Sequence, residues 1–262
     1  MKQDGRLGGR SALIIGGSRG IGFGIAEAFA REGADLMLAA TDENKLEKAR
    51  EAITKYGTRV VSSAMDVSER DDCFAVAKQA IAEFGRLDIM VNAAGLYIPR
   101  AFVDYTLEEF DRIQKVNVYG TFNMMQAVLP HMLERKYGKI INIASTAGKW
   151  ASRNQSAYNV SKHGVVGMTR CVALETAACG ITVNAICPGF VETDMLSDFV
   201  RDHAAVTHTP TDVIRAGILQ RVPQGRFINI AECGHLAVYL ASAESDSMTG
   251  QSLLLDGGML FV

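Results

Sequence analysis

The sequence predicts an α/β fold of the Rossmann type, a doubly wound parallel sheet of about seven strands with helices on both faces. Short apolar runs alternate with helical patterns along the whole chain, and several runs are continuously apolar, as strands buried on both faces are. No internal repeat or proline-rich linker interrupts this alternation. A chain of 262 residues, 48% of them hydrophobic, can bury one large core, so we expect a single domain over 1–262.

The individual elements can be assigned in chain order. The predicted strands are Ser11–Ile15, Leu36–Ala40, Val60–Met65, Ile89–Asn92, Lys139–Ala144, Thr182–Cys187 and Ser252–Leu255. Helical periodicity between them predicts helices at Phe23–Arg31, Asn44–Tyr56, Glu69–Phe84, Leu107–Arg135 and Ala157–Ala178. Ligands of such sheets bind at the carboxyl ends of the strands, where the strand order reverses, so the chemistry is expected at that edge.

Composition restricts the classes of function. A net charge of −2 does not favour a polyanionic partner such as nucleic acid, and no apolar run approaches the ~18 residues that a membrane span needs. Residues 1–10 lack the apolar segment of a signal peptide, so we expect a cytoplasmic location. The five cysteines form no C-x-x-C pair and the five histidines show no metal-ligand spacing, so neither disulfides nor a bound metal is expected.

A glycine-rich turn follows the first predicted strand and leads directly into a helical pattern. Backbone N–H groups in such a turn can approach a pyrophosphate closely, and the helix N-terminus adds favourable partial charge. The spacing is G-x-x-x-G-x-G, which differs from the commoner G-x-G-x-x-G fingerprint of dinucleotide-binding proteins. The candidate pyrophosphate-binding residues are Gly16, Ser18, Arg19, Gly20, Ile21 and Gly22.

The end of the second strand bears on the choice of dinucleotide. An acidic residue there would bind the ribose hydroxyls and repel a 2′-phosphate. The strand instead ends at Ala40, followed by Thr41, and the acid comes only at Asp42. Arg19 can reach toward the same ribose, so the pattern favours NADP(H), with Thr41 as a further contact. NAD(H) stays possible if Asp42 turns toward the ribose; Asp42 could also be a helix N-cap and Arg19 simply an exposed residue.

A tyrosine and a lysine provide the strongest indication of catalysis. Tyr158 and Lys162 are four residues apart in a helical stretch and therefore share one face. Ser145 ends the fifth predicted strand, and Asn117 lies in the long helix before it. Hydride reduction of a ketone needs a proton for the developing alkoxide, and an ammonium group near a tyrosine lowers the pKa of the phenol toward working pH. A serine hydroxyl can fix the carbonyl oxygen by a hydrogen bond.

These separated motifs, taken together, resemble the short-chain dehydrogenase/reductase family from about Gly9 to Gly258. The resemblance implies a nicotinamide cofactor, with Tyr158 as acid/base and Lys162 also binding the nicotinamide ribose. It implies that Asn117 holds a water in a proton relay and that Asp66 and Val67 contact the adenine. The remaining cofactor contacts implied by the family pattern are Asn92, Ala93, Gly95, Pro188, Gly189, Val191 and Thr193.

The substrate is not fixed by these motifs. The expected function interconverts a small secondary alcohol and its ketone, with the substrate contacted by Tyr97, Trp150, Gln155 and Met195. A segment at about 194–224 follows the nicotinamide-lining turn directly and is expected to form a two-helix lid over the substrate. The main alternative is a 3-ketoacyl-[acyl-carrier-protein] reductase. Against it, one of the two basic carrier-docking positions that the resemblance implies is occupied by Lys136, but the other is Cys179.

Two further expectations concern partners and activity. The helices Leu107–Arg135 and Ala157–Ala178 carry apolar residues on more than the face that covers the sheet, and the family resemblance implies a homotetramer that pairs these helices. A dinucleotide-binding regulator without turnover is a second class of function. The presence of Asn117, Ser145, Tyr158 and Lys162 speaks against that class, because such a protein would be expected to have lost Tyr158 or Lys162.

Overall fold

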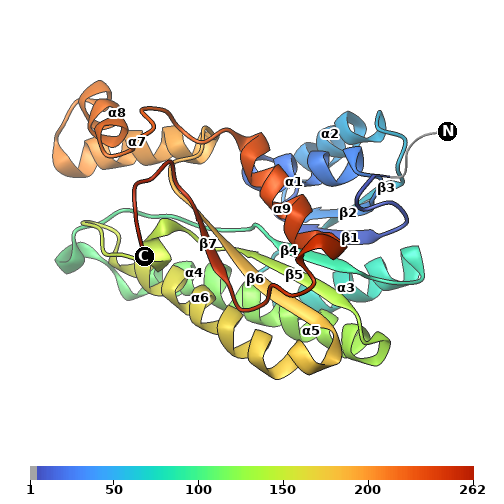
Figure 1. Cartoon of the computed structure of the whole chain (residues 1–262). Helices are drawn as coiled ribbons and strands as arrows, with labels where there is room; N and C mark the ends of the chain where they lie inside the picture. Colours follow the sequence, from blue (N-terminus) through green and yellow to red (C-terminus); the bar gives the residue numbers. More distant parts are fainter. Residues whose placement is uncertain (1–4) are drawn as a thin grey trace.

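Seven parallel strands form one sheet in the computed structural model, which describes residues 5–262 (Figure 1). The spatial order is β3-β2-β1-β4-β5-β6-β7, so the direction of winding reverses between β1 and β4. The predicted fold class is confirmed, and the predicted strand ends agree within one residue. The strands are β1 (Ser11–Ile15), β2 (Asp35–Ala40), β3 (Val60–Ala64), β4 (Ile89–Asn92), β5 (Gly138–Ile143), β6 (Ile181–Pro188) and β7 (Ser252–Leu255).

Helices cover both faces of the sheet and make a three-layer molecule (Figure 1). One face packs against α1 (Gly20–Arg31), α2 (Glu43–Thr54) and α9 (Ile230–Ala241). The other face packs against α3 (Arg70–Phe84), α5 (Gly120–Arg135) and α6 (Ser156–Thr176), and α4 (Leu107–Gln114) lies against α6.

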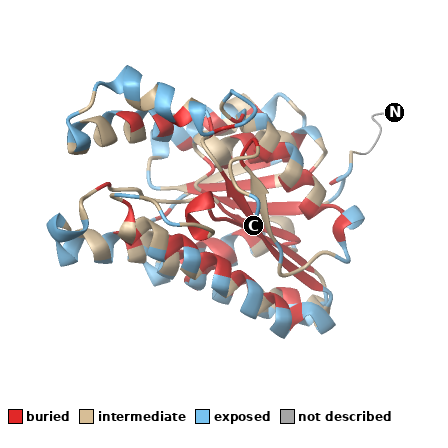
Figure 2. Ribbon diagram, turned by 60° about the vertical axis from the view of Figure 1, so that its left-hand side comes forward, coloured by how far each residue is buried: buried red, intermediate tan, exposed pale blue. Residues whose placement is uncertain are grey.

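Alternation along each strand divides the core into two apolar layers. Ile14 and Leu38 point into the layer under α1 and α9, whereas Leu13 and Met37 point into the layer under α3 and α5. All four side chains are fully buried, and burying a side chain of this size stabilises a fold by about 1.5–3 kcal/mol. Figure 2 shows the result: the strands are buried and the outer faces of the helices are exposed.

The long helix predicted over Leu107–Arg135 is interrupted. The structure has α4, then a π-helical turn at Lys115–Tyr119, then α5. This turn carries Asn117, whose side chain is buried and bonds in both directions to the backbone of Leu96. A hydrophobic pattern cannot distinguish a π-turn from an uninterrupted α-helix. The π-turn adds one residue to the helix but is made of the same kinds of residue.

Two helices follow β6 and lie beyond the carboxyl ends of the strands (Figure 1). They are α7 (Asp194–Thr207) and α8 (Thr211–Gln220), and we refer to residues 194–224 as the lid segment. His208, with φ of 52°, ends α7 in the left-handed conformation, and Pro210 precedes α8. Among residues 5–262, no helix has both the length and the apolar character needed to cross a membrane.

Candidate active site

A cavity of about 1420 Å³ opens at the carboxyl ends of the strands. It runs from the glycine turn after β1, past the ends of β4 and β5, to the underside of α7 and α8. This is the edge at which the strand order reverses, so it is the location expected for a ligand in a doubly wound sheet. All but two of the site residues predicted from the sequence line this cavity; the exceptions are Asn92 and Asn117.

The glycine turn has a conformation that side chains would obstruct. Gly16 has φ of 78°, and a Cβ there would lie 2.7 Å from the backbone nitrogen of Ala94. A Cβ on Gly22 would lie 2.2 Å from the carbonyl oxygen of Gly16. The turn therefore folds tightly onto the start of α1 and leaves the N-terminus of that helix facing the cavity. Such an arrangement of backbone N–H groups and helix dipole fits a pyrophosphate.

The end of β2 brings Ala40 and Thr41, neither of which carries a charge, to the cavity. Asp42 caps α2, because its Oδ1 accepts a hydrogen bond from the backbone N–H of Lys45 at 3.0 Å and its Oδ2 pairs with the Lys45 ammonium at 3.0 Å. These contacts lower the pKa of Asp42. Arg19 is more than half exposed and lies 3.8 Å from Asp194 of the lid segment. Asp42 is therefore committed to its own helix, while the Arg19 guanidinium is accessible at the cavity edge.

The rest of the dinucleotide-side wall comes from the ends of β3, β4 and β6. Asp66 makes a tight turn in which its Oδ1 accepts hydrogen bonds from the backbone and hydroxyl of Ser68. Thr193 donates a hydrogen bond to the carbonyl of Val191 and is the N-cap residue of α7. Further predicted contacts on this wall are Ile21, Val67, Ala93, Gly95, Pro188 and Gly189. The combination of glycine cradle, exposed helix start and extended wall fits a dinucleotide.

Asn92 ends β4, as the sequence predicts, but its side chain does not line the cavity. Its side chain is buried inside the sheet, and its Nδ2 donates to Oδ1 of Asn142 on β5 at 2.7 Å. Asn142 in turn donates to Thr169 of α6 at 2.9 Å. Asn92 therefore ties β4 to β5 and α6 behind the cavity wall, and the neighbouring Ala93 and Gly95 are the residues that face the cavity.

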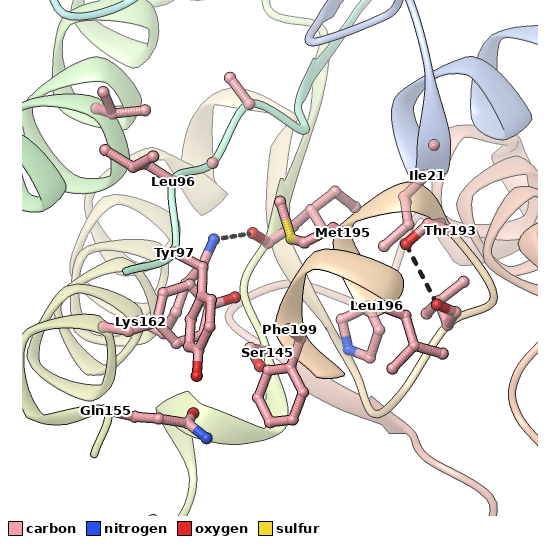
Figure 3. Close-up of a pocket in the computed structure, with 18 of the residues that line it drawn as sticks. Ile21, Leu96, Tyr97, Ser145, Gln155, Lys162, Thr193, Met195, Leu196 and Phe199 are labelled. Atoms are coloured by element: carbon pink, nitrogen blue, oxygen red, sulfur yellow. Dashed lines mark hydrogen bonds between the residues drawn. The ribbon is translucent and has the colours of Figure 1, made fainter. Parts of the chain in front are cut away.

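Ser145, Tyr158 and Lys162 all line the cavity, and Figure 3 shows Ser145 and Lys162 in it. Ser145 lies two residues after the end of β5, and Tyr158 and Lys162 lie on successive turns of α6. The Lys162 ammonium is 5.7 Å from the centroid of the Tyr158 ring and donates a hydrogen bond to the carbonyl of Ile143 at 2.9 Å. The strand end and the helix together thus place a hydroxyl, a phenol and an ammonium at one point.

Burial, rather than the lysine charge, dominates the protonation of this cluster. Desolvation raises the pKa of the Tyr158 phenol to about 12, and a hydrogen bond with Ser145 acts in the opposite direction. Desolvation also lowers the pKa of the Lys162 ammonium to about 8. The Lys162 ammonium donates its hydrogen bond to the carbonyl of Ile143. The expectation that this ammonium lowers the pKa of the tyrosine stays a prediction.

Asn117 approaches this cluster without lining the cavity. A Cβ on Gly95 would lie 3.7 Å from Oδ1 of Asn117 and 3.6 Å from Nζ of Lys162, so both side chains surround the same glycine. Oδ1 of Asn117 accepts from the backbone N–H of Leu96 at 2.7 Å, and its Nδ2 donates to the hydroxyl of Ser161 at 2.9 Å. The visible effect of Asn117 is to fix the loop that carries Gly95 and Tyr97.

The substrate end of the cavity is rich in aromatic rings. Tyr97 stands edge-on to Tyr158 with ring centroids 5.2 Å apart, and its other side meets Phe199 of α7, also at 5.2 Å. Trp150 stacks against the guanidinium of Arg221 at 4.5 Å, which joins the loop after β5 to the end of α8. Met195 lies at the start of α7, and the mostly buried Gln155 lies just before α6 (Figure 3).

His203 was missed as a site residue by sequence reasoning. Its Nδ1 lies 3.1 Å from the hydroxyl of Tyr97, and its ring stacks on Phe199 at 4.7 Å with an interplanar angle of 10°. The available signal was the four-residue spacing of Phe199 and His203 on a predicted lid helix, which puts both on one face. The partner of that face, Tyr97, is 106 residues away in sequence.

The whole chain is similar to known oxidoreductases. A family model described as enoyl-(acyl carrier protein) reductase matches residues 16–260. D-beta-hydroxybutyrate dehydrogenase of Cupriavidus necator is 38% identical, over 96% of this chain and 98% of that protein. The 3-oxoacyl-[acyl-carrier-protein] reductase of Thermotoga maritima is 34% identical, over 97% of this chain and 99% of that protein.

Two solved structures show the same similarity in three dimensions. NAD⁺-bound xylitol dehydrogenase has a TM-score of 0.94 at 30% identity, covering 96% of this chain and 99% of that one. An actinorhodin polyketide ketoreductase variant with NADPH has a TM-score of 0.93 at 32% identity, covering 98% of this chain and 99% of that one. Both the family match and these relatives extend over nearly the full length. The chain therefore belongs to the short-chain dehydrogenase/reductase family and is an NAD(P)-binding oxidoreductase that acts on CH–OH groups.

Proposed function

We propose that this enzyme interconverts a small, neutral secondary alcohol and its ketone, with Tyr158 as acid/base and NADP(H) as the preferred cofactor. The observation that carries the proposal is the meeting of Ser145, Tyr158 and Lys162 at the point where the dinucleotide end of the cavity joins its aromatic end. All three side chains line the cavity that would hold the substrate. The dinucleotide, when bound, supplies or accepts the hydride.

The chain's own residues handle the oxygen and its proton. In reduction, the protonated Tyr158 phenol donates its proton to the oxygen of the carbonyl; in oxidation, the phenolate accepts it from the alcohol. The Ser145 hydroxyl orients this oxygen by a hydrogen bond and stabilises the charge that develops on it. The buried Lys162 ammonium, held by the carbonyl of Ile143, favours the phenolate that reduction leaves behind.

The first prediction concerns the cofactor. Because Asp42 is committed to capping α2 and Arg19 is accessible, wild-type kcat/KM is expected to be higher with NADP(H) than with NAD(H). Ala40→Asp should reverse the preference by roughly 10–100-fold or more, since a charged hydrogen-bonded contact contributes about 1.5–3 kcal/mol. The measurement is the ratio of kcat/KM for the two cofactors. Ala64→Asp is the matched control, because Ala64 ends the neighbouring strand in register with Ala40 but does not line the cavity.

The second prediction tests the substrate class against the ketoacyl reductase alternative. The lid segment is attached to the body by Arg221 on Trp150, by His203 on Tyr97 and by an ion pair of Arg215 with Glu192 at 2.7 Å. An acyl chain that arrives on a carrier protein would have to pass these contacts. A spectrophotometric screen is therefore expected to show turnover of small neutral ketones or secondary alcohols and little turnover of acetoacetyl thioesters. An acetoacetyl thioester that is turned over better than every small ketone would favour the alternative.

The third prediction concerns assembly. Apolar side chains remain exposed on the outer surfaces of the π-turn, α5 and α6 and at the C-terminal end; they are Tyr119, Phe122, Leu133, Val160, Leu174, Phe261 and Val262. Exposed apolar surface of this kind is typical of subunit interfaces. We expect a homotetramer of D₂ symmetry, and light scattering at micromolar concentration measures its mass. A monomeric mass would contradict it.

A further inference from the structure

A hydrogen-bonded pair from two distant parts of the chain borders the reacting centre. Tyr97, on the loop after β4, places its hydroxyl 3.1 Å from Nδ1 of His203 on α7, and both residues line the cavity. The Tyr97 ring also stands edge-on to Tyr158, with centroids 5.2 Å apart. The pair therefore lies one side chain away from the phenol that exchanges the proton.

In either tautomer of the histidine, the pair has one hydrogen-bond donor and one acceptor without a partner. The described residues provide no partner for Nε2 of His203, and the Tyr97 hydroxyl has only the histidine nitrogen as its partner. If the hydroxyl donates to Nδ1, the pair presents the Nε2 hydrogen as a donor and the tyrosine oxygen as an acceptor. If Nδ1 donates, the pair presents the tyrosine hydrogen as a donor and Nε2 as an acceptor. The two positions lie at opposite ends of the pair, and each can bind a hydroxyl group, which both donates and accepts.

Burial also favours the uncharged form of both members of the pair. Desolvation lowers the pKa of His203, and it raises the pKa of Tyr97 above its usual range, with the neighbouring Asp202 acting in the same direction. Asp202 itself pairs with Arg201 on the outer face of α7, at 2.9 Å. An uncharged imidazole offers no charge attraction to a carboxylate, so the pair favours an alcohol over an acid as its ligand.

A third polar group faces the same space. Gln155 is 8% exposed and lines the cavity, and its side-chain amide makes no hydrogen bond with the other described residues. Figure 3 shows Gln155 reaching in below Tyr97, with Ser145 and Phe199 beside them. Because the amide faces the cavity and is not paired within the protein, a ligand or water can satisfy it there. The amide, again one donor group and one acceptor, adds a second position that suits a hydroxyl.

From this arrangement we propose that Tyr97 and His203 form a specificity site that binds a second hydroxyl group of the substrate, so the preferred substrates are diols or hydroxyketones rather than simple alcohols. Phe199 keeps the imidazole in place by stacking, and Gln155 satisfies a further oxygen. This inference depends on the proposed function, because the hydroxyl group it concerns is a second one, in addition to the alcohol or ketone that reacts at Tyr158.

The test compares matched substrates that differ by one hydroxyl. Butane-2,3-diol is paired with butan-2-ol, and cyclohexane-1,2-diol with cyclohexanol, under saturating cofactor. We expect wild-type kcat/KM to favour the diol by at least about tenfold, because a site built to hydrogen-bond a hydroxyl rejects the analogue that lacks it. His203→Phe keeps a ring to stack on Phe199 and should reduce the diol-to-alcohol ratio about tenfold.

A second variant separates recognition from mere support of the lid. Tyr97→Phe keeps the ring against Tyr158 and should reduce the ratio similarly, whereas the double variant should lose little more than either single one, because all remove the same contact. His235→Phe is the control, since His235 is exposed on α9 away from the cavity, and it should leave the ratio as in wild type.

Three outcomes would overturn the inference. The wild type could show no higher kcat/KM for diols than for alcohols, or His203→Phe could reduce kcat/KM equally for both members of each pair. A hydroxy acid of the same size could also prove to be the preferred substrate. An equal loss would show that the pair only docks the lid. These failures are distinguishable from failure of the proposed function, which would appear as no turnover of any alcohol or ketone, or as full activity of Tyr158→Phe.

Discussion

Tyr158→Phe is expected to reduce kcat by about 10²–10⁴-fold, the range typical of a general acid–base group, while dinucleotide binding survives. The substitution removes the transferable proton but keeps the ring, so the edge-on contact with Tyr97 and the packing of α6 are retained. Steady-state kinetics with the best ketone found, together with fluorescence titration of the dinucleotide, measures the two effects separately. Tyr158 is held protonated by burial, so the loss should appear in the reductive direction at neutral pH.

Tyr239→Phe is the matched control for this variant. Tyr239 lies on α9, packs partly buried against the core layer under α1 and α9, and does not line the cavity. Its replacement should change kcat by less than about twofold, because substitutions away from special features usually alter free energies by at most ±0.5 kcal/mol. Near-normal turnover by Tyr158→Phe would show that Tyr158 is not the general acid. The acid would then be another group that lines the cavity.

Local patterns were sufficient for most of the fold. Strands buried on both faces are recognisable as continuous apolar runs, and the predicted ends of β1, β4 and β7 coincide with those observed. The sequence left two alternatives for Asp42, an N-cap of α2 or a contact with the ribose. The first was considered because Asp before a helical pattern is a typical N-cap. The structure was needed to choose between them, since a carboxylate can rotate about its side-chain bonds and the sequence does not say where its partner lies.

Features that depend on long-range packing could not be predicted. The spacing of Tyr158 and Lys162 places them on one face, but the hydrogen bond from Lys162 to the carbonyl of Ile143 depends on how α6 docks on β5. The desolvation that moves both pKa values depends on the same docking. The contact of Tyr97 with His203 joins segments 106 residues apart, and it exists only because α7 folds back over the cavity.

Gly22→Ala is expected to weaken dinucleotide binding by at least about 100-fold, which corresponds to losing about two hydrogen bonds to a charged group at 1.5–3 kcal/mol each. The added Cβ would lie 2.2 Å from the carbonyl oxygen of Gly16 and 3.2 Å from Cβ of Ala93. The first neighbour is backbone and cannot rotate away, so the turn must open and its N–H groups must leave their positions at the start of α1. Gly167→Ala is the control: it lies inside α6, does not line the cavity, a Cβ there meets nothing within 4 Å, and alanine should stabilise that helix by up to about 1 kcal/mol. Fluorescence titration with the preferred dinucleotide measures affinity, and circular dichroism shows whether Gly22→Ala remains folded. A folded Gly22→Ala variant with wild-type affinity would mean that the glycine turn does not hold the pyrophosphate.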